Sequence, residues 1–268
     1  MNKSIDRLIS LNKKNAVITG GSGNLGRVIA DAYMEKGCRI CLIDKNEKEL
    51  KIVKRLLEKK YKKEVLIYTV DIENKNELYK FVNYAKKKIG KINILVNNAA
   101  FVGDSQLSGW VENFENQSIE VWERALRVNL GAAFQLVQLL TNIFDKRNGT
   151  SIINIGSIYG LVGPDWSLYE GTKMGNPAAY SVSKAGLLQL TRWLATTLGP
   201  NIRVNSISPG GLLRGQSKEF IIKYVKKTPM QRMGREEDIK GAAIFLGSNM
   251  SNWITGQNIV IDGGYTIW

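Results

Sequence analysis

Histidine is absent from the chain, and only two of its 268 residues are cysteines. Without histidine, a Ser-His-Asp triad, a Cys-His nucleophile pair and a histidine-ligated metal are all excluded. Cys38 and Cys41 lie three residues apart, a spacing that in a strand points the two side chains to opposite faces. No second cysteine pair exists to complete a zinc site. We therefore expect no metal cofactor and no redox role for the two thiols.

Long apolar runs are also missing. No run reaches the roughly 18 residues of a membrane span, and the first residues, MNKSIDRLIS, lack the apolar core and cleavage site of a secretory signal. Apolar residues make up 44% of the chain and charged residues 23%, which excludes a disordered, collagen-like or disulfide-dense chain. We expect a globular protein of the cytoplasm with no membrane contact.

Acidic residues are scarce relative to basic ones, with 24 against 38 and a net charge of +14. Such a balance can indicate nucleic acid, a membrane surface or an anionic small molecule as the partner. The lysines follow the polar faces of predicted helices at residues 45–63 and 80–91, and no zinc-finger, RRM or basic-zipper pattern accompanies them. Solvated helix faces explain most of this charge, an anionic substrate is the alternative, and no nucleic-acid partner is expected.

Short β-rich runs alternate with longer helical patterns along the chain. The alternation predicts βαβ units and hence an α/β fold: a Rossmann-type, doubly wound parallel sheet of about seven strands with helices on both faces. Without repeats or Pro-rich linkers, we expect one domain over residues 14–268, preceded by a loose arm over residues 1–13. Strands are expected at 16–19, 39–43, 65–70, 92–97, 151–156, 203–206 and 258–261, and helices at 24–36, 47–60, 75–88, 119–145, 177–198, 218–226 and 237–246.

The predicted helix at residues 119–145 is long, and its second half, LGAAFQLVQLL, is apolar nearly all round. A helix of that pattern needs cover on more than one side. The sheet provides one cover. The other is either a neighbouring helix of the same chain or a partner subunit, and the second choice would make the protein a homodimer or homotetramer.

A glycine-rich stretch, Thr19-Gly20-Gly21-Ser22-Gly23-Asn24-Leu25-Gly26, follows the first predicted strand and opens a helix. Glycines allow a tight turn and close approach to a pyrophosphate, and the helix N-terminus offers free N–H groups and a favourable dipole. The residues expected to touch a dinucleotide here are Gly20, Ser22, Asn24, Leu25 and Gly26. A tight strand–helix turn without a ligand is the alternative.

Two carboxylates end the next strands of the same unit. Asp44 stands 18 residues after Gly26, where it can accept hydrogen bonds from ribose hydroxyls and would repel a 2′-phosphate. This favours NAD over NADP, although Lys45 follows directly. Asp71 and Ile72, after the third strand, are placed for an adenine contact, with a turn residue as the alternative for Asp71.

Tyr180 and Lys184 are four residues apart in a predicted helix and therefore share one face. Lowering the tyrosine pKa from about 10 by about three units requires roughly 4 kcal/mol. One ammonium at about 4 Å supplies that much at an effective dielectric of about 20, and an oxidised nicotinamide would add positive charge. The pair can therefore serve as a base without histidine, although two surface helix residues have the same spacing by chance.

Beyond these pairs, the chain resembles the short-chain dehydrogenase/reductase family over nearly its whole length. Several motifs carry the resemblance in the family's order: the T-G-x-x-x-x-x-G loop at 19–26, Asp71, Asn97-Asn98-Ala99-Ala100, Asn129, Ser157, Tyr180-Ser-Val-Ser-Lys184, Pro209-Gly210 and Asp262-Gly263-Gly264.

The resemblance implies a role for each matching residue. Tyr180 would be the general acid/base, Lys184 would lower its pKa and hold the nicotinamide ribose, and Ser157 would bind the substrate oxygen. Asn129 would bend its helix and support a proton-relay water, and Asn97 would brace the sheet. Asn98, Ala99 and Ala100 would line the cofactor, as would Pro209, Gly210 and Leu212 beside the nicotinamide.

The sequence departs from the family pattern at several positions. Asn24 replaces the second loop glycine, Ala100 replaces the usual glycine of N-N-A-G, and Arg214 stands where many members have a threonine. The gap from Ser157 to Tyr180 is 23 residues, longer than is common, and Ser167, 13 residues before Tyr180, is a rival for the catalytic serine. Ser157 is preferred because it directly follows a buried strand.

The extra residues form an insert at 163–175, whose two ends both lie at the expected active site. Tyr169, Glu170 and Lys173 in the insert, together with Arg214, are candidate substrate residues suited to a polyhydroxylated, anionic molecule; a tolerated surface loop is the alternative. The stretch Tyr-Glu-Gly-Thr at 169–172, with Ser-Pro-Gly-Gly-Leu at 208–212, resembles the flagellin-modification protein A branch. That branch is associated with nonulosonic acids for surface glycans.

The sequence thus predicts an NAD-dependent oxidoreductase that interconverts a secondary alcohol and a ketone on an anionic sugar. A general carbonyl reductase, with the insert serving only as a lid, is a second hypothesis. A dinucleotide-sensing protein without catalysis is a third, and the intact Ser157, Tyr180 and Lys184 argue against it. A sugar-nucleotide epimerase or dehydratase ranks low, because little chain follows Tyr180.

Overall fold

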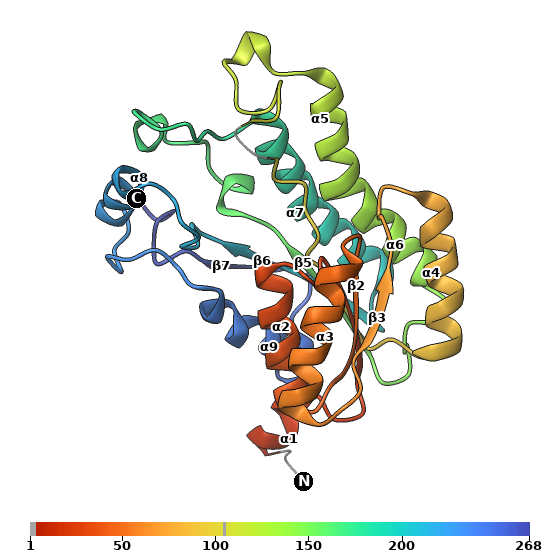
Figure 1. Cartoon of the computed structure of the whole chain (residues 1–268). Helices are drawn as coiled ribbons and strands as arrows, with labels where there is room; N and C mark the ends of the chain where they lie inside the picture. Colours follow the sequence, from red (N-terminus) through yellow and green to blue (C-terminus); the bar gives the residue numbers. More distant parts are fainter. Residues whose placement is uncertain (1–3, 104–105) are drawn as a thin grey trace.

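The computed structural model describes residues 4–103 and 106–268, and its centre is a seven-stranded parallel sheet (Figure 1). The strand order is β3-β2-β1-β4-β5-β6-β7, so the winding reverses between β1 and β4. The predicted doubly wound Rossmann-type sheet is confirmed. The strands are β1 (Asn15–Thr19), β2 (Arg39–Asp44), β3 (Leu66–Thr69), β4 (Ile94–Asn97), β5 (Thr150–Ile155), β6 (Ile202–Pro209) and β7 (Asn258–Ile261).

Helices cover both faces of the sheet, and each face has its own apolar core. Side chains from α2, α3 and α9 pack on one face, and side chains from α4, α6 and α7 pack on the other. Strands β4 and β5 are buried along their whole length, which is why they read as continuous apolar runs. The helices named here are α2 (Asn24–Glu35), α3 (Glu47–Tyr61), α4 (Lys75–Lys88), α6 (Ala132–Leu140), α7 (Ala178–Leu198) and α9 (Lys240–Gly247).

The predicted long helix at residues 119–145 is present but is shorter and interrupted. It consists of α5 (Ile119–Leu126), a π-turn at Arg127–Gly131 and α6, which ends at Leu140. Asn129, where a bend is expected, thus lies within a π-turn, a local widening that often marks functional sites. Residues beyond Leu140 form turns that bring Phe144 back to the sheet, where it pairs with Ile92.

The predicted loose arm at residues 1–13 is not loose where the structure describes it. Residues Ile5–Ile9 form α1, capped by the Ser4 hydroxyl, and Leu11 is fully buried in the core of the α2 face. Burial of one large apolar side chain, Leu11, anchors this segment. A lone apolar residue makes no periodic pattern, so the sequence does not predict this anchor. Residues 1–3 lie outside the described part of the chain. Within that part, no helix is both long enough and apolar enough to cross a membrane.

Candidate active site

A cavity of about 770 Å³ lies at the carboxyl ends of the strands. It begins over the turn after β1 and extends past the end of β5 to helix α8 (Lys218–Lys226). In open α/β sheets this crevice, where the strand order reverses, is the usual ligand site. Its volume suits a ligand of cofactor size.

The glycine turn after β1 forms the floor of one end. Gly20 has a φ of +61°, and a Cβ at Gly26 would stand 2.2 Å from the Gly20 carbonyl oxygen. Gly26 itself does not line the cavity, so its role is to let α2 pack against the turn. Asn24 and Leu25 face the cavity at the start of α2, whose N-cap Gly23 offers no side-chain cap. The first N–H groups of the helix thus suit a pyrophosphate.

Asp44 lies at the edge of this end with a fixed orientation. Its Oδ2 accepts hydrogen bonds from the Ser22 hydroxyl at 2.7 Å and the Ser22 N–H at 3.2 Å, and its Oδ1 accepts one from Asn46 N–H at 3.1 Å. Ser22, Asp44 and Lys45 all line the cavity. An oriented carboxylate at this position suits the ribose hydroxyls of NAD.

Asn98 supports the glycine turn from the neighbouring strand β4. Its Nδ2 donates to the carbonyls of Thr19 at 2.9 Å and Gly20 at 3.1 Å, while the N–H groups of Asn98 and Ala99 both donate to Thr19 Oγ1 at 2.9 Å. The predicted wall residues Asn98, Ala99, Ala100, Asp71 and Ile72 line the cavity, as do Pro209, Gly210 and Leu212 on its far side.

The buried pair Asn97 and Asn154 braces the sheet, as expected for Asn97. Its Nδ2 donates to Asn154 Oδ1 at 2.8 Å, across the neighbouring strands β4 and β5.

Ser157, Tyr180 and Lys184 meet at the other end of the cavity. Ser157 follows β5 directly, and its hydroxyl accepts a hydrogen bond from Tyr159 N–H at 3.2 Å. Lys184 is 3% exposed, donates from Nζ to the Ile155 carbonyl at 2.8 Å and lies 5.8 Å from the centre of the Tyr180 ring. The structure therefore brings together the three residues that the sequence singled out for chemistry.

Burial is the largest cause of the pKa shifts of Tyr180 and Lys184. Burial raises the pKa of Tyr180, and a hydrogen bond with Ser157 and the charge of Arg214 lower it by less. Burial also lowers the pKa of Lys184 to about 8. From the sequence, Lys184 is expected to lower the pKa of Tyr180, but in the structure its ammonium donates to the Ile155 carbonyl, and the charge that lowers the tyrosine pKa is that of Arg214.

Asn129 does not line the cavity but ties three segments together behind it. It is 2% exposed; its Oδ1 accepts from Phe101 N–H at 2.6 Å, and its Nδ2 donates to the Phe101 carbonyl at 3.1 Å and to Ser183 Oγ at 3.0 Å. The loop after β4, the π-turn and α7 are thereby joined. Because Ser183 precedes Lys184, this amide fixes the register of the helix that carries Tyr180.

Ser167, the rival of Ser157, lies outside the cavity lining. Its hydroxyl donates to Asp165 Oδ1 at 2.7 Å and accepts from Lys227 Nζ at 3.2 Å. These contacts occupy it in the packing of the insert, and the geometry favours Ser157 as the catalytic serine.

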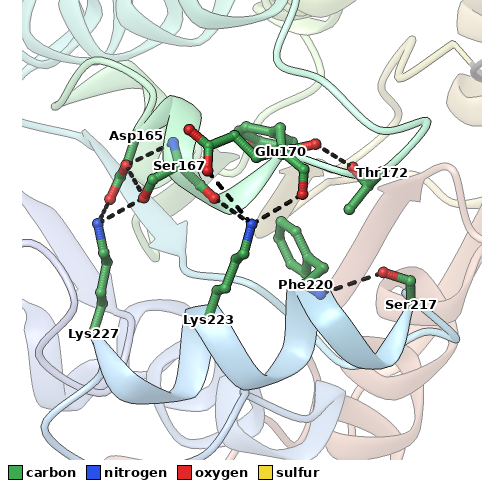
Figure 2. Close-up of polar contacts among 9 residues, drawn as sticks. Asp165, Ser167, Glu170, Thr172, Ser217, Phe220, Lys223 and Lys227 are labelled. Carbon is green, nitrogen blue, oxygen red and sulfur yellow. Dashed lines mark hydrogen bonds and ion pairs between the residues drawn. The ribbon is translucent and has the colours of Figure 1, made fainter.

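The insert is joined to α8 by two lysines (Figure 2). Lys223 Nζ donates to the carbonyls of Ser167 at 2.8 Å and Glu170 at 2.9 Å, and Lys227 pairs with Asp165. The insert and α8 lie side by side (Figure 1) and together form the outer wall of the cavity. We call this set of contacts the lysine clamp.

The four candidate substrate residues divide into two pairs. Tyr169 and Arg214 line the cavity, whereas Glu170 and Lys173 do not. Glu170 is turned toward Lys223, 3.8 Å away, and Lys173 is exposed, so the prediction that these two face the substrate is not supported by the geometry. Arg214 already forms an ion pair with Glu236, with 2.8 Å between Nε and Oε1.

Sequence reasoning missed the aromatic residues of the outer wall. Tyr159, Phe220 and Tyr224 line the cavity, together with Met174 and Met233. Burial raises the pKa of Tyr224 to about 12, and its hydroxyl accepts a hydrogen bond from Gly211 N–H at 2.6 Å. Only Tyr159, two residues after Ser157, had a positional signal in the sequence, because the others come from segments far from any motif.

Cys38 and Cys41 belong to the cores on opposite faces of the sheet, as the strand spacing predicted. Burial raises the pKa of each thiol to about 12. Across residues 4–103 and 106–268, no group of three or more cysteine, aspartate or glutamate side chains is arranged to hold a metal ion.

Known proteins resemble this chain over nearly its full length. A family model described as enoyl-(acyl carrier protein) reductase matches residues 21–266. A Campylobacter coli protein named post-translational flagellin modification protein A is 35% identical, covering 95% of this chain and 99% of that protein. An NAD-dependent glycerol dehydrogenase of Listeria innocua is 31% identical, with coverage of 99% and 98%. A crystal structure of a short-chain dehydrogenase from Leptospira borgpetersenii with bound NAD⁺ is 32% identical, with a TM-score of 0.83 and coverage of 99% and 97%.

Proposed function

The chain belongs to the short-chain dehydrogenase/reductase family, whose members interconvert alcohols and ketones with NAD or NADP, and on that basis we propose that it is an NAD(H)-dependent oxidoreductase acting on an anionic sugar. The observation that carries the proposal is the single cavity shared by Ser157, Tyr180, Lys184, Asp44 and the glycine turn. A cofactor site and an acid/base group thus open into one space.

Each of these residues has its own role in the proposed reaction. A bound nicotinamide supplies or accepts the hydride. Ser157 holds the substrate oxygen by a hydrogen bond, and Tyr180 takes the hydroxyl proton during oxidation or returns it during reduction. The buried Lys184 ammonium keeps positive charge beside the tyrosine and would hold the ribose of a bound cofactor. Asn129, through Phe101 and Ser183, keeps the catalytic helix in place; its side-chain amide is used in these bonds and does not reach the cavity, so the expected contact with a proton-relay water is not supported for the side chain.

Asp44 supports NAD rather than NADP as the cofactor. Its carboxylate is oriented by Ser22 and Asn46 at the edge of the cavity, where a 2′-phosphate would meet negative charge. The nearby cation Arg27 is already engaged, since its Nη2 pairs with Glu49 at 2.5 Å and its Nε donates to the Ser22 carbonyl at 2.6 Å. Lys45, which also lines this wall, would favour a phosphate.

The sugar substrate is supported by relatives and by the cavity wall. One relative is named for flagellin modification and another for glycerol oxidation. The wall offers the hydroxyls of Tyr159 and Tyr169 and the guanidinium of Arg214, which suit a polyhydroxylated molecule with an anionic group. We place the reaction in surface-glycan synthesis of the nonulosonic-acid type, in the cytoplasm.

Exposed apolar side chains support a homodimer or homotetramer. Ile119 on α5, Phe134 on α6 and Trp193 on α7 are 61%, 42% and 54% exposed. Helices α5 and α7 contact one another, so a second copy of the chain covering them would bury apolar surface that a monomer leaves in water. This is also the second cover that the apolar α6 requires.

The test compares Arg214→Ala with wild type on matched anionic and neutral sugars. A charge-assisted contact of about 1.5–3 kcal/mol predicts about a ten- to hundredfold loss of kcat/KM on the anionic sugar. NADH affinity, measured by fluorescence titration, should stay unchanged and exceed NADPH affinity. Arg55→Ala, an exposed arginine on α3, is the control.

Three results would point elsewhere. If Arg214→Ala loses NADH affinity and treats both sugars alike, Arg214 serves the cofactor. Turnover of simple ketones in preference to sugars favours the general carbonyl reductase. NADH binding without turnover of any alcohol or ketone favours a dinucleotide-sensing protein.

A further inference from the structure

Two tyrosine hydroxyls meet in the cavity wall near the catalytic serine. The Oη atoms of Tyr159 and Tyr169 are 2.5 Å apart, and both residues line the cavity. Tyr159 is held from one side, because its N–H donates to Ser157 Oγ. Tyr169 comes from the insert and lines the same cavity as Tyr180. The pair therefore stands beside the reacting centre.

This pair keeps a hydrogen-bonding group available for a third partner. Two phenols carry two hydroxyl hydrogens, and the bond between them uses one, so one hydrogen can still be donated. Burial raises the pKa of Tyr159 and of Tyr169, so both stay neutral at physiological pH. A neutral pair that both donates and accepts suits a neutral hydroxyl.

Apolar groups surround the pair on the cavity side. Tyr169 is 9% exposed, and its ring packs against Phe220 at 5.7 Å between centroids. Met174 and Met233 complete this part of the wall. A polar group in such surroundings binds a matching hydroxyl well and rejects a substrate that lacks it, because the rejected complex leaves the polar group unpaired.

We propose that the Tyr159–Tyr169 pair is a specificity site that binds a second hydroxyl of the substrate, on a carbon close to the one that is oxidised or reduced. The inference rests on the proposed oxidoreductase function and deepens it, since it names the feature of the substrate that the insert recognises. A vicinal diol is the smallest molecule with that feature.

The lysine clamp positions this site from outside the cavity. Lys223 and Lys227 hold Ser167, Glu170 and Asp165 on both sides of Tyr169 (Figure 2). The backbone on either side of Tyr169 is thus fixed to α8, which also supplies Phe220 to the ring. Lys223 and Lys227 are positioning residues, because they act through the insert and do not line the cavity.

The experiment measures binding of two probes, trans-cyclohexane-1,2-diol and cyclohexanol, to the enzyme–NADH complex by ligand-detected NMR. Wild type should prefer the diol. Tyr169→Phe and Tyr159→Phe should each weaken diol binding about three- to tenfold, the range expected for one neutral hydrogen bond, with cyclohexanol unchanged. The double variant should lose no more than either single one, because the two hydroxyls act as a unit.

Tyr79→Phe, which removes the hydroxyl of an exposed tyrosine on α4, controls for the substitution itself, and a thermal melt checks folding. Equal binding of both probes by wild type, or an equal loss for both probes in the variants, would overturn the proposal. An alcohol cannot be turned over in the NADH complex, so this experiment measures binding alone. Oxidation of the two probes is measured separately with NAD⁺, and its absence counts only against the proposed function.

The clamp is tested with the double variant Lys223→Gln/Lys227→Gln. It should lose the preference for the diol while keeping its NADH affinity. Lys226→Gln, on the exposed side of the same helix, is the matched control and should keep both. A clamp variant that retains the full diol preference would show that the lysines do not position the site.

Discussion

The two ends of the cavity are held together by different kinds of contact. At the cofactor end, the contacts are made to the backbone of the glycine turn: Gly26 packs against the Gly20 carbonyl, and the Asn98 side chain holds the turn through the Thr19 and Gly20 carbonyls. At the substrate end, side chains from distant segments meet one another. Tyr159 and Tyr169 line the cavity there with their hydroxyls in contact, and lysines fasten the insert to α8 from outside.

The difference explains what each end can discriminate. Backbone N–H groups and glycines recognise a phosphate, which every dinucleotide carries, so this end can serve many reactions unchanged. Side chains in the outer wall can be altered one at a time without disturbing the sheet. The cofactor end therefore defines the class of reaction, and the substrate end defines the molecule on which it acts.

Tyr180→Phe should give the largest effect, and it should separate turnover at the substrate end from NADH binding at the cofactor end. Loss of the proton-transferring group should lower kcat by about 10²- to 10⁴-fold, while NADH affinity changes by less than about twofold because the ring remains. Steady-state kinetics and fluorescence titration measure the two quantities. Turnover within a few-fold of wild type would show that another group moves the proton.

Lys184 belongs to both ends, and its burial predicts a pH-dependent stability. Its pKa is about 8 in the folded chain, against an ordinary 10.5, so between these values the unfolded chain binds more protons and stability rises with pH. From pH 7 to pH 10, wild type should gain about 2–3 kcal/mol relative to Lys184→Met. Urea denaturation without cofactor measures the difference.

Lys48→Met, at an exposed position of α3, provides the reference for that measurement. A constant difference between wild type and Lys184→Met across the pH range would mean that the ammonium is not desolvated by the fold.

Two glycine substitutions, one at each end of the cavity, are expected to give the smallest effects on stability and NADH binding. Gly26→Ala places a methyl group against the Gly20 carbonyl and should lower the free energy of unfolding by about 1–3 kcal/mol, with weaker NADH binding. Gly163→Ala in the insert meets nothing within 4 Å and should leave both quantities unchanged. Unaltered NADH affinity in Gly26→Ala would contradict the packing role of this glycine.

The cofactor end was predictable from the sequence because its structure depends on local chain geometry. The glycine turn, Asp44 after β2 and the alternation of apolar runs are all readable within short windows. The same holds for the fold, whose seven strands appear within a few residues of their expected positions.

The substrate end was predictable only in part. The position of the insert followed from the distance between Ser157 and Tyr180, but the directions of its side chains did not. Glu170 turns to Lys223, and Tyr169 turns inward to Tyr159. Each side-chain direction depends on a contact with a residue outside the insert, which is Lys223 of α8 for Glu170 and Tyr159 for Tyr169. A local sequence pattern does not reveal such a contact. Leu11 escaped prediction for the same reason.

Three anchors of α7 lie outside the insert. Asn129 holds Ser183, Asn154 Nδ2 donates to Thr191 Oγ1 at 2.9 Å, and Lys184 reaches the Ile155 carbonyl. The helix that carries Tyr180 is thus fixed before the insert is considered. The insert at residues 163–175 lies after Ser157 and before α7, so evolution or a protein engineer can lengthen, shorten or replace it and change the substrate without moving Ser157, Tyr180 or Lys184.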